Sequence, residues 1–178
     1  RAALPGLALA LLCLLRAGAE VPVQPDFSAE KFAEIWYVTA TASNCSIFLK
    51  MKDGMKSSMA IISFTSEGDL ALKLDKCQKF ELLFQQSGQA GHYIGTSAQE
   101  KRDLLVMETN HSHYAVLHEA QHSKTEPSTV LQFLTREQDV SPQLLQKFME
   151  LIPTMGLTED MLAVLPKLGE CPKGTGCL

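Results

Sequence analysis

Apolar and polar residues alternate along short segments through most of the chain, a pattern typical of β-strands that bury one face. Turn residues such as Glu67-Gly68-Asp69 separate these segments. Eight strands are predicted, over residues 35–40, 59–64, 70–74, 80–84, 92–96, 103–108, 113–119 and 129–135. The pattern therefore predicts an all-β fold. Eight antiparallel strands close well into an up-and-down barrel with room for one small ligand, although a sandwich fits the same spacing.

One helix is predicted after the eighth strand. Ser141 is a suitable N-cap and Pro142 suits the first helical position. A single apolar stripe runs along the helix before Pro153 ends it, formed by Leu144, Leu145, Phe148, Met149 and Ile152. Because its other side is polar, this C-terminal α-helix should pack outside the barrel. A short ninth strand is expected at residues 162–165.

The only tryptophan, Trp36, lies where a short helical turn gives way to the first strand. Ser28 can cap that turn, and alternating β-formers begin at Ile35. A rigid aromatic side chain at such a junction is expected to plug one end of the core.

The first residues have the pattern of a secretory signal peptide. An apolar run over residues 7–15 precedes Ala17-Gly18-Ala19, which predicts cleavage before Glu20. The chain then consists of a signal peptide, 1–19, and a single domain, 20–178. Since the run is shorter than the ~20 residues that span a bilayer, we expect a secreted, extracellular protein without a membrane span.

The mature domain is acidic. Loss of Arg1 and Arg16 changes the count from 16 basic and 20 acidic residues to 14 and 20, a net charge of −6. Nucleic acid is therefore not expected as a partner. No Cys-x-x-Cys motif and no cysteine–histidine cluster at zinc spacing occurs in the sequence, so neither a metal nor a cofactor is expected.

Export places the cysteines in an oxidising compartment. Cys13 leaves with the signal peptide, and three pairings are possible for the four that remain, Cys45, Cys77, Cys171 and Cys177. The only two asparagines, Asn44 and Asn110, both lie in acceptor sequons. Glycosylation is predicted at each.

Three segments resemble the signatures of the lipocalin family. Residues 32–37, Phe-Ala-Glu-Ile-Trp-Tyr, are similar to the first signature, Thr109-Asn110-His111 lies where the second is expected, and Arg136 resembles the third. The likeness covers the mature chain and is closest to lipocalin fifteen, the lipocalin-type prostaglandin D synthases and the extracellular fatty-acid-binding protein. It implies a calyx whose closed end is plugged by Trp36, with Arg136 packed across it.

The sequence departs from the family pattern at Glu34, where the signature has glycine, and at Asn110-His111, which replace Asp-Tyr. We expect the barrel to survive both departures. The resemblance also implies a disulfide between Cys77 and Cys171.

Cys45 and Cys177 are then left over. Cys45 is predicted to follow the first strand, in the loop over the open mouth. We expect it to be a free, reactive thiol or to bond a disulfide-linked partner or a second copy, with neighbouring Lys50 and Lys52 favouring the thiolate. An internal bridge to Cys177 is the alternative.

An isomerase of this family needs a nucleophilic cysteine on the second strand and hydroxyl groups on neighbouring strands. Ungapped alignment puts the nucleophile at Met59 and the hydroxyl groups at Val38, Ile61 and Leu74. A thioether cannot form a thiolate. A slip of one residue brings Ser58 to the site, but serine without a nearby base is a poor nucleophile, so no enzyme is predicted.

We therefore predict a transport protein that binds a small hydrophobic ligand, such as a fatty acid or a retinoid, inside the barrel. Alternation predicts an apolar lining made of Val38, Met59, Ile61, Leu72, Leu74, Leu82, Phe84, Met107 and Leu117.

Siderophore binding and thiol-based scavenging are the alternatives. Relatives that capture siderophores line the mouth with cationic residues, and the corresponding positions here are Leu82, His118 and Gln121. The histidines on and beside the seventh strand are interpreted as exposed side chains rather than a metal site; these are His111, His113, His118 and His122.

Overall fold

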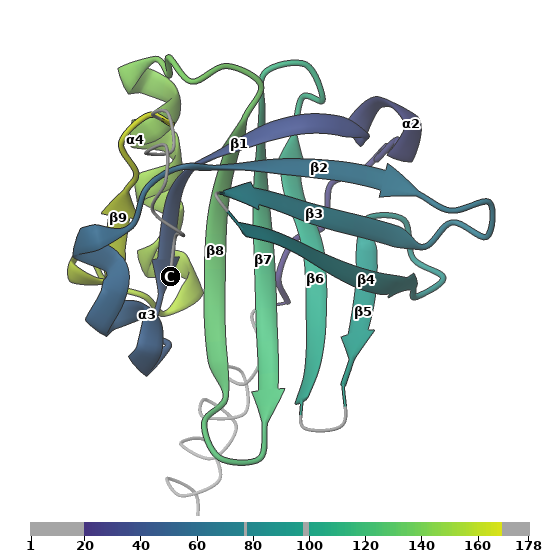
Figure 1. Ribbon diagram of the computed structural model, residues 1–178, viewed down its shortest axis with the longest axis horizontal. Coiled ribbons are helices and arrows are strands. Elements are labelled where there is room, and N and C mark those ends of the chain that lie inside the picture. The colour runs from purple at the N-terminus through teal and green to yellow at the C-terminus, as the bar shows by residue number, and fades with distance from the viewer. Residues whose placement is uncertain (1–19, 77, 98–99, 169–178) are drawn as a thin grey trace, which may run out of the picture.

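The structure is a computed structural model that describes residues 20–76, 78–97 and 100–168. Nine strands form one antiparallel sheet in the order β2-β3-β4-β5-β6-β7-β8-β1-β9 (Figure 1). A further pairing of β1 with β2 closes strands β1 to β8 into a barrel. The strands are β1 (Glu34–Ser43), β2 (Ser58–Phe64), β3 (Leu70–Lys76), β4 (Gln78–Gln86), β5 (His92–Thr96), β6 (Glu100–Thr109), β7 (Tyr114–Ser123), β8 (Ser128–Thr135) and β9 (Leu162–Val164). The predicted barrel is confirmed, and the sandwich is excluded.

The two halves of strand β1 pair with different strands. Its first half, from Glu34 to Val38, pairs with β2, whereas Ala40 to Ala42 pair with β9. A bulge between Val38 and Ala40 interrupts the pairing with β8 and reverses the alternation of side chains. Trp36 and Val38 therefore face the barrel interior, while Ala40 and Ala42 belong to the apolar cluster outside it.

Helix α4 (Pro142–Leu151) packs on the outside of the barrel beside β1 and β8, as the sequence predicts (Figure 1). Ser141 caps it, with its Oγ accepting a hydrogen bond from the Leu144 N–H. The ring of Phe148 is buried and stacks on Phe133 of β8, with 5.2 Å between the ring centroids. The apolar stripe of α4 and the outer faces of β1 and β8 thus form a second core.

Two further short helices flank β1 along the chain. Figure 1 shows α2 (Ala29–Phe32) and α3 (Ser46–Met51) at opposite ends of β1. Three short 3-10 turns complete the list: Lys52–Gly54, Pro153–Met155 and Glu159–Met161. The helical turn at α2 was predicted from the sequence, whereas residues 46–54 were expected to form a loop. No helix within the described ranges is long and apolar enough to cross a membrane.

Several predictions concern residues outside those that the structure describes. The signal peptide at 1–19 and the disulfide between Cys77 and Cys171 are among them, as is the bridge from Cys45 to Cys177. They remain predictions.

Candidate functional site

The closed end of the barrel is built around Trp36, which is 0% exposed. Its Nε1 donates a hydrogen bond to the Phe32 carbonyl oxygen at 2.8 Å. The guanidinium of Arg136 lies 3.7 Å from the centre of the Trp36 ring, within cation–π range. It also donates hydrogen bonds of 2.8–3.2 Å to four backbone carbonyl oxygens, those of Lys31, Ala33, Ile35 and His111. Arg136 therefore joins β8 to the entrance of β1.

Both departures from the family signatures lie beside this closed end. Glu34, where the signature has glycine, has a φ of 80°, a region that costs a side chain roughly 1–2 kcal/mol. His111 has a φ of 63°, and its Nε2 accepts a hydrogen bond from the Ser28 N–H at 3.1 Å. The barrel closes in spite of the strain at Glu34.

The structure brings six of the nine predicted lining residues together. Four are buried in the interior cluster: Val38, Leu72, Phe84 and Leu117. Leu74 and Leu82 pack against this cluster and stay partly exposed.

Met59 and Ile61 are the first correction to the predicted lining. Ala60 and Ile62 of β2 belong to the interior cluster, so alternation places Met59 and Ile61 on the outer face. Ile61 pairs there with the exposed Ile35. Strand β2 carries apolar residues on both faces, and its pattern therefore does not fix which face is buried.

Met107 is the second correction. The register of β6 with β7 shifts between Val106 and Glu108. Val106 faces the interior, whereas Met107 belongs to the cluster under α4. Leu104 and Val106 face the interior, so alternation alone places Met107 on the outer face, before the register shift takes effect. Because β6 is apolar on both faces at residues 104–107, its pattern does not fix which face is buried.

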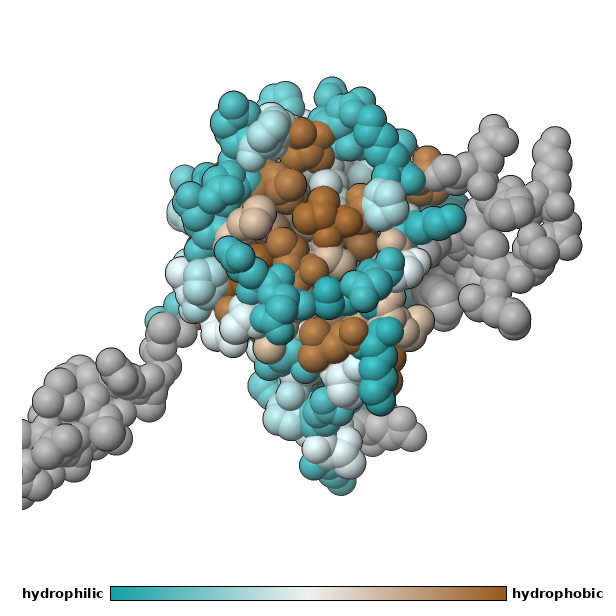
Figure 2. Space-filling view, turned by 90° about the vertical axis from the view of Figure 1, so that its left-hand side faces the viewer, coloured by the Kyte–Doolittle hydropathy of each residue, from teal (hydrophilic) through white to brown (hydrophobic). Residues whose placement is uncertain are grey.

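The barrel interior is accessible away from the closed end. Leu74, Leu82, Val130 and Gln132 all point inward by register, yet each is only partly buried. Side chains that face inward can be exposed only if space within the barrel is open to solvent. Figure 2, which looks onto the side that carries α3, α4 and β9, shows hydrophobic residues gathered in the middle of this face and ringed by hydrophilic ones.

The segment that contains α3 contributes to the interior from the open side. Phe48 of α3 and Met55, just after the 3-10 turn, are partly buried and pack against the interior cluster. Neither residue was predicted from the sequence. The only available signal was a pair of large apolar side chains within an otherwise polar loop.

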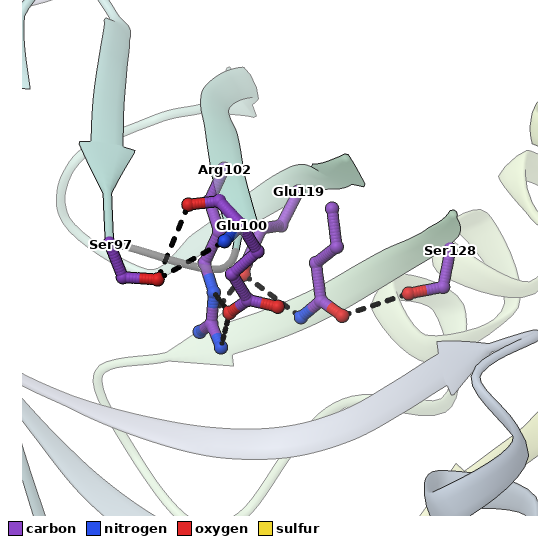
Figure 3. A network of polar contacts seen from close by, with 6 residues as sticks. Ser97, Glu100, Arg102, Glu119 and Ser128 are labelled. Carbon is purple, nitrogen blue, oxygen red and sulfur yellow. Dashed lines mark hydrogen bonds and ion pairs between the residues drawn. The ribbon is translucent and has the colours of Figure 1, made fainter. Parts of the chain in front are cut away.

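A polar network lies on the inner face of the barrel, beyond the apolar lining (Figure 3). Its centre is Arg102 of β6, which contacts Glu100 of the same strand and Glu119 of β7. Gln121 Nε2 donates a hydrogen bond to Glu119 Oε1 at 3.1 Å, and Ser128 Oγ donates one to Gln121 Oε1 at 2.8 Å. Among these residues, the sequence analysis considered only Gln121.

Register fixes the direction in which this network points. Arg102 pairs with Gln121, and Glu119 pairs with Leu104, which belongs to the interior cluster. Inward alternation thus continues from apolar to charged residues along β6 and β7. If only apolar residues are expected on the inner face, Arg102 and Glu119 are assigned to solvent. Counting every second residue from Leu104 and from Leu117 would instead have placed both on the inner face.

His118 was expected at the mouth of the barrel or on its surface, but it lies in neither place. It pairs with Leu105 and Leu131 on the outer face and is 7% exposed. Its Nδ1 is buried and has no hydrogen-bond partner among the residues that the structure describes. Burial lowers the pKa of His118.

Replacing His118 with leucine should raise the free energy of unfolding by about 1–2 kcal/mol, because a buried unpartnered polar atom is removed. The lowered pKa favours neutral imidazole in the folded state. The unfolded chain therefore binds more protons as the pH falls below 6.5, and stability is lost in that window. Urea unfolding should show a larger gain at pH 5.5 than at pH 7.5.

The exposed His113 offers a matched control. His113→Gln should change stability by less than about 0.5 kcal/mol at either pH. A His118→Leu protein that is no more stable than its parent would contradict the assignment.

Two further histidines share one carboxylate on the outer face. His92 contacts Asp103 Oδ1 at 3.0 Å, and His122 contacts Oδ2 at 2.8 Å. Burial alone would raise the pKa of Asp103, but the two hydrogen bonds and the charge of Lys101 lower it overall. Within the part of the chain that the structure describes, no group of three or more His, Cys, Asp or Glu residues could hold a metal ion.

Cys45, at the N-cap of α3, is partly buried and forms no disulfide with another described residue. Its backbone N–H donates a hydrogen bond to Ser43 Oγ at 3.0 Å. The side-chain oxygens of the exposed Asn44 and Asn110 both accept backbone hydrogen bonds, from Thr129 and from the turn before β7 respectively. Glycosylation and an intermolecular disulfide remain predictions.

A closed eight-stranded barrel with one plugged end and an accessible, mostly apolar interior defines a class of small-molecule-binding proteins. Comparison with known proteins leads to the same class. The sequence profile of the Lipocalin / cytosolic fatty-acid binding protein family matches residues 34–168, and the chain belongs to this family.

Individual relatives extend the comparison. Human Lipocalin-15 is 38% identical over 171 residues, which cover 93% of this chain and 92% of the relative. Prostaglandin-H2 D-isomerase from Canis lupus familiaris is 30% identical over 163 residues, covering 87% and 85%. A solved structure described as "The Siderocalin Ex-FABP functions through dual ligand specificities" superposes with a TM-score of 0.69 at 28% identity, covering 79% of this chain and 97% of its own.

Proposed function

We propose that this protein is a secreted carrier that binds one small hydrophobic molecule inside the barrel. The observation that carries the proposal is the partial exposure of Leu74 and Leu82, which face inward. Apolar side chains left accessible inside a barrel offer surface that a ligand can bury, at roughly 0.8 kcal/mol per methylene before the costs of association. The family name and the apolar run at residues 7–15 support the carrier and its export.

The proposal does not include isomerase activity. The inward residue nearest the expected nucleophile is Ser58, whose partner on β1 is Val38, a side chain that cannot act as a base. Cys45, the free cysteine of the described ranges, lies at the N-cap of α3 rather than on β2. Neither arrangement supplies an activated nucleophile.

Siderophore capture, suggested by the description of the solved structure, has less support. An iron–catecholate complex carries several negative charges and needs converging cations. Arg102 is the cation of the polar network, and Glu100 and Glu119 already engage it.

A pair of tryptophan variants tests the carrier. Leu74→Trp should fill accessible space in the interior and weaken binding of a fluorescent fatty-acid or retinoid analogue at least tenfold, about 1.4 kcal/mol. Met59→Trp, on the same sheet but facing outward, is the matched control and should bind like the parent. Fluorescence titration measures both dissociation constants, and circular dichroism checks the fold.

Equal affinities in the parent and both variants would place the ligand elsewhere. If the parent bound no apolar probe, the interior would be filled and the carrier proposal would fail.

A further inference from the structure

The polar network lies where the head group of an amphiphile bound in the barrel would be. Leu104, Glu119 and Val130 face inward at one level of the barrel, and Arg102 and Gln121 follow at the next. A chain that is buried against the apolar lining and extends toward the open side therefore meets these carboxylates. Glu119 is only 12% exposed, so its charge acts within the barrel.

Within this network, the two carboxylates outnumber the one cation. Arg102 directs Nε and Nη2 to Glu100, with a 2.5 Å contact from Nε, and Nη1 to Glu119 at 3.4 Å. All three guanidinium nitrogens are thus engaged by two carboxylates, and the trio carries a net charge of −1. Every contact that the described residues make with either carboxylate ends on Oε1. The two Oε2 atoms are left to accept hydrogen bonds from a ligand.

Arg102 is a poor receptor for a ligand carboxylate. A third carboxylate at this guanidinium would lie beside two like charges, which repel it. Releasing Glu119 to make room would leave a mostly buried carboxylate without its cation, which is also unfavourable.

We propose that the barrel selects amphiphiles whose head group donates hydrogen bonds, a primary ammonium or an alcohol, over carboxylates with the same chain. This inference rests on the proposed carrier function and names its ligand class. Glu119 and Glu100 receive the head group, and Arg102 holds the two carboxylates in place.

Chain-matched competitors test the inference on the full mature protein at pH 7.4. Dodecylamine, dodecan-1-ol and dodecanoate each displace N-phenyl-1-naphthylamine, whose fluorescence reports occupancy of the interior. The amine and the alcohol should displace it at concentrations at least tenfold lower than dodecanoate. Glu119→Gln removes one charge, keeps the side-chain shape, and should reduce that ratio to less than about threefold.

Glu81→Gln is the matched control, because it removes the same charge from the outer face of β4, where Glu81 pairs with Lys73. It should leave the ratio unchanged. Dodecanoate that binds as well as the amine and the alcohol would overturn the head-group preference but not the carrier. A ratio that Glu119→Gln leaves intact, or that Glu81→Gln reduces equally, would overturn the role of the network. Failure of the probe itself to bind would instead refute the carrier.

Discussion

Replacing Arg136 with methionine should lower the free energy of unfolding by about 3–4 kcal/mol. The substitution keeps the apolar stem but removes a charged donor from four backbone carbonyl oxygens and from the face of Trp36. Hydrogen bonds to charged groups and a cation–π contact are each worth about 0.5–3 kcal/mol, and their sum is less than additive. Urea unfolding followed by the fluorescence of Trp36, the only tryptophan, measures the loss.

Arg136→Lys distinguishes geometry from charge in this arrangement. Lysine keeps the positive charge but lacks the planar fork that reaches several carbonyl groups at once. Its stability should fall between those of the parent and Arg136→Met. A methionine variant within about 1 kcal/mol of the parent would show that the closed end does not depend on this contact.

Truncating Phe148 to alanine should cost about 3–4 kcal/mol, because it opens a cavity between α4 and the barrel. Phe148 is 1% exposed and stacks on Phe133. Its exposed neighbour Gln146 gives a matched control on the same helix, and Gln146→Ala should change stability by less than about 0.5 kcal/mol. Equilibrium unfolding in urea compares the three proteins.

Ligand affinity provides a second measurement for the same variants. Phe148 lies outside the barrel, so the folded Phe148→Ala protein should bind an apolar probe with unchanged affinity. A loss of stability no greater than that of Gln146→Ala would mean that α4 is not anchored through this ring.

Local sequence patterns were sufficient to predict the barrel and its outer helix. Ser141 and Pro142 mark the start of α4 because capping depends on neighbouring residues alone, and the alternation in β3 is strict enough to place Leu72 and Leu74 inside. The junction of a helical turn and a strand predicted that Trp36 plugs one end, and the family signatures added Arg136. Their mutual contact joins residues 100 positions apart, which no local pattern can predict.

The errors in the predicted site have physical causes. Both β2 and β6 carry apolar residues on their two faces, and for this reason Met59, Ile61 and Met107 were misplaced. Arg102 and Glu119 were missed because charged residues are normally solvated. They can lie on an inner face here because each supplies the other with an opposite charge.

The sharing of strands between the two cores has a consequence for how the molecule unfolds. Strands β1 and β6 each contribute side chains both to the barrel interior and to the core under α4. The two cores therefore share the same backbone, and neither can melt while the strands of the other remain ordered. Unfolding should be a single cooperative transition, in which loss of the outer helix and opening of the barrel occur together.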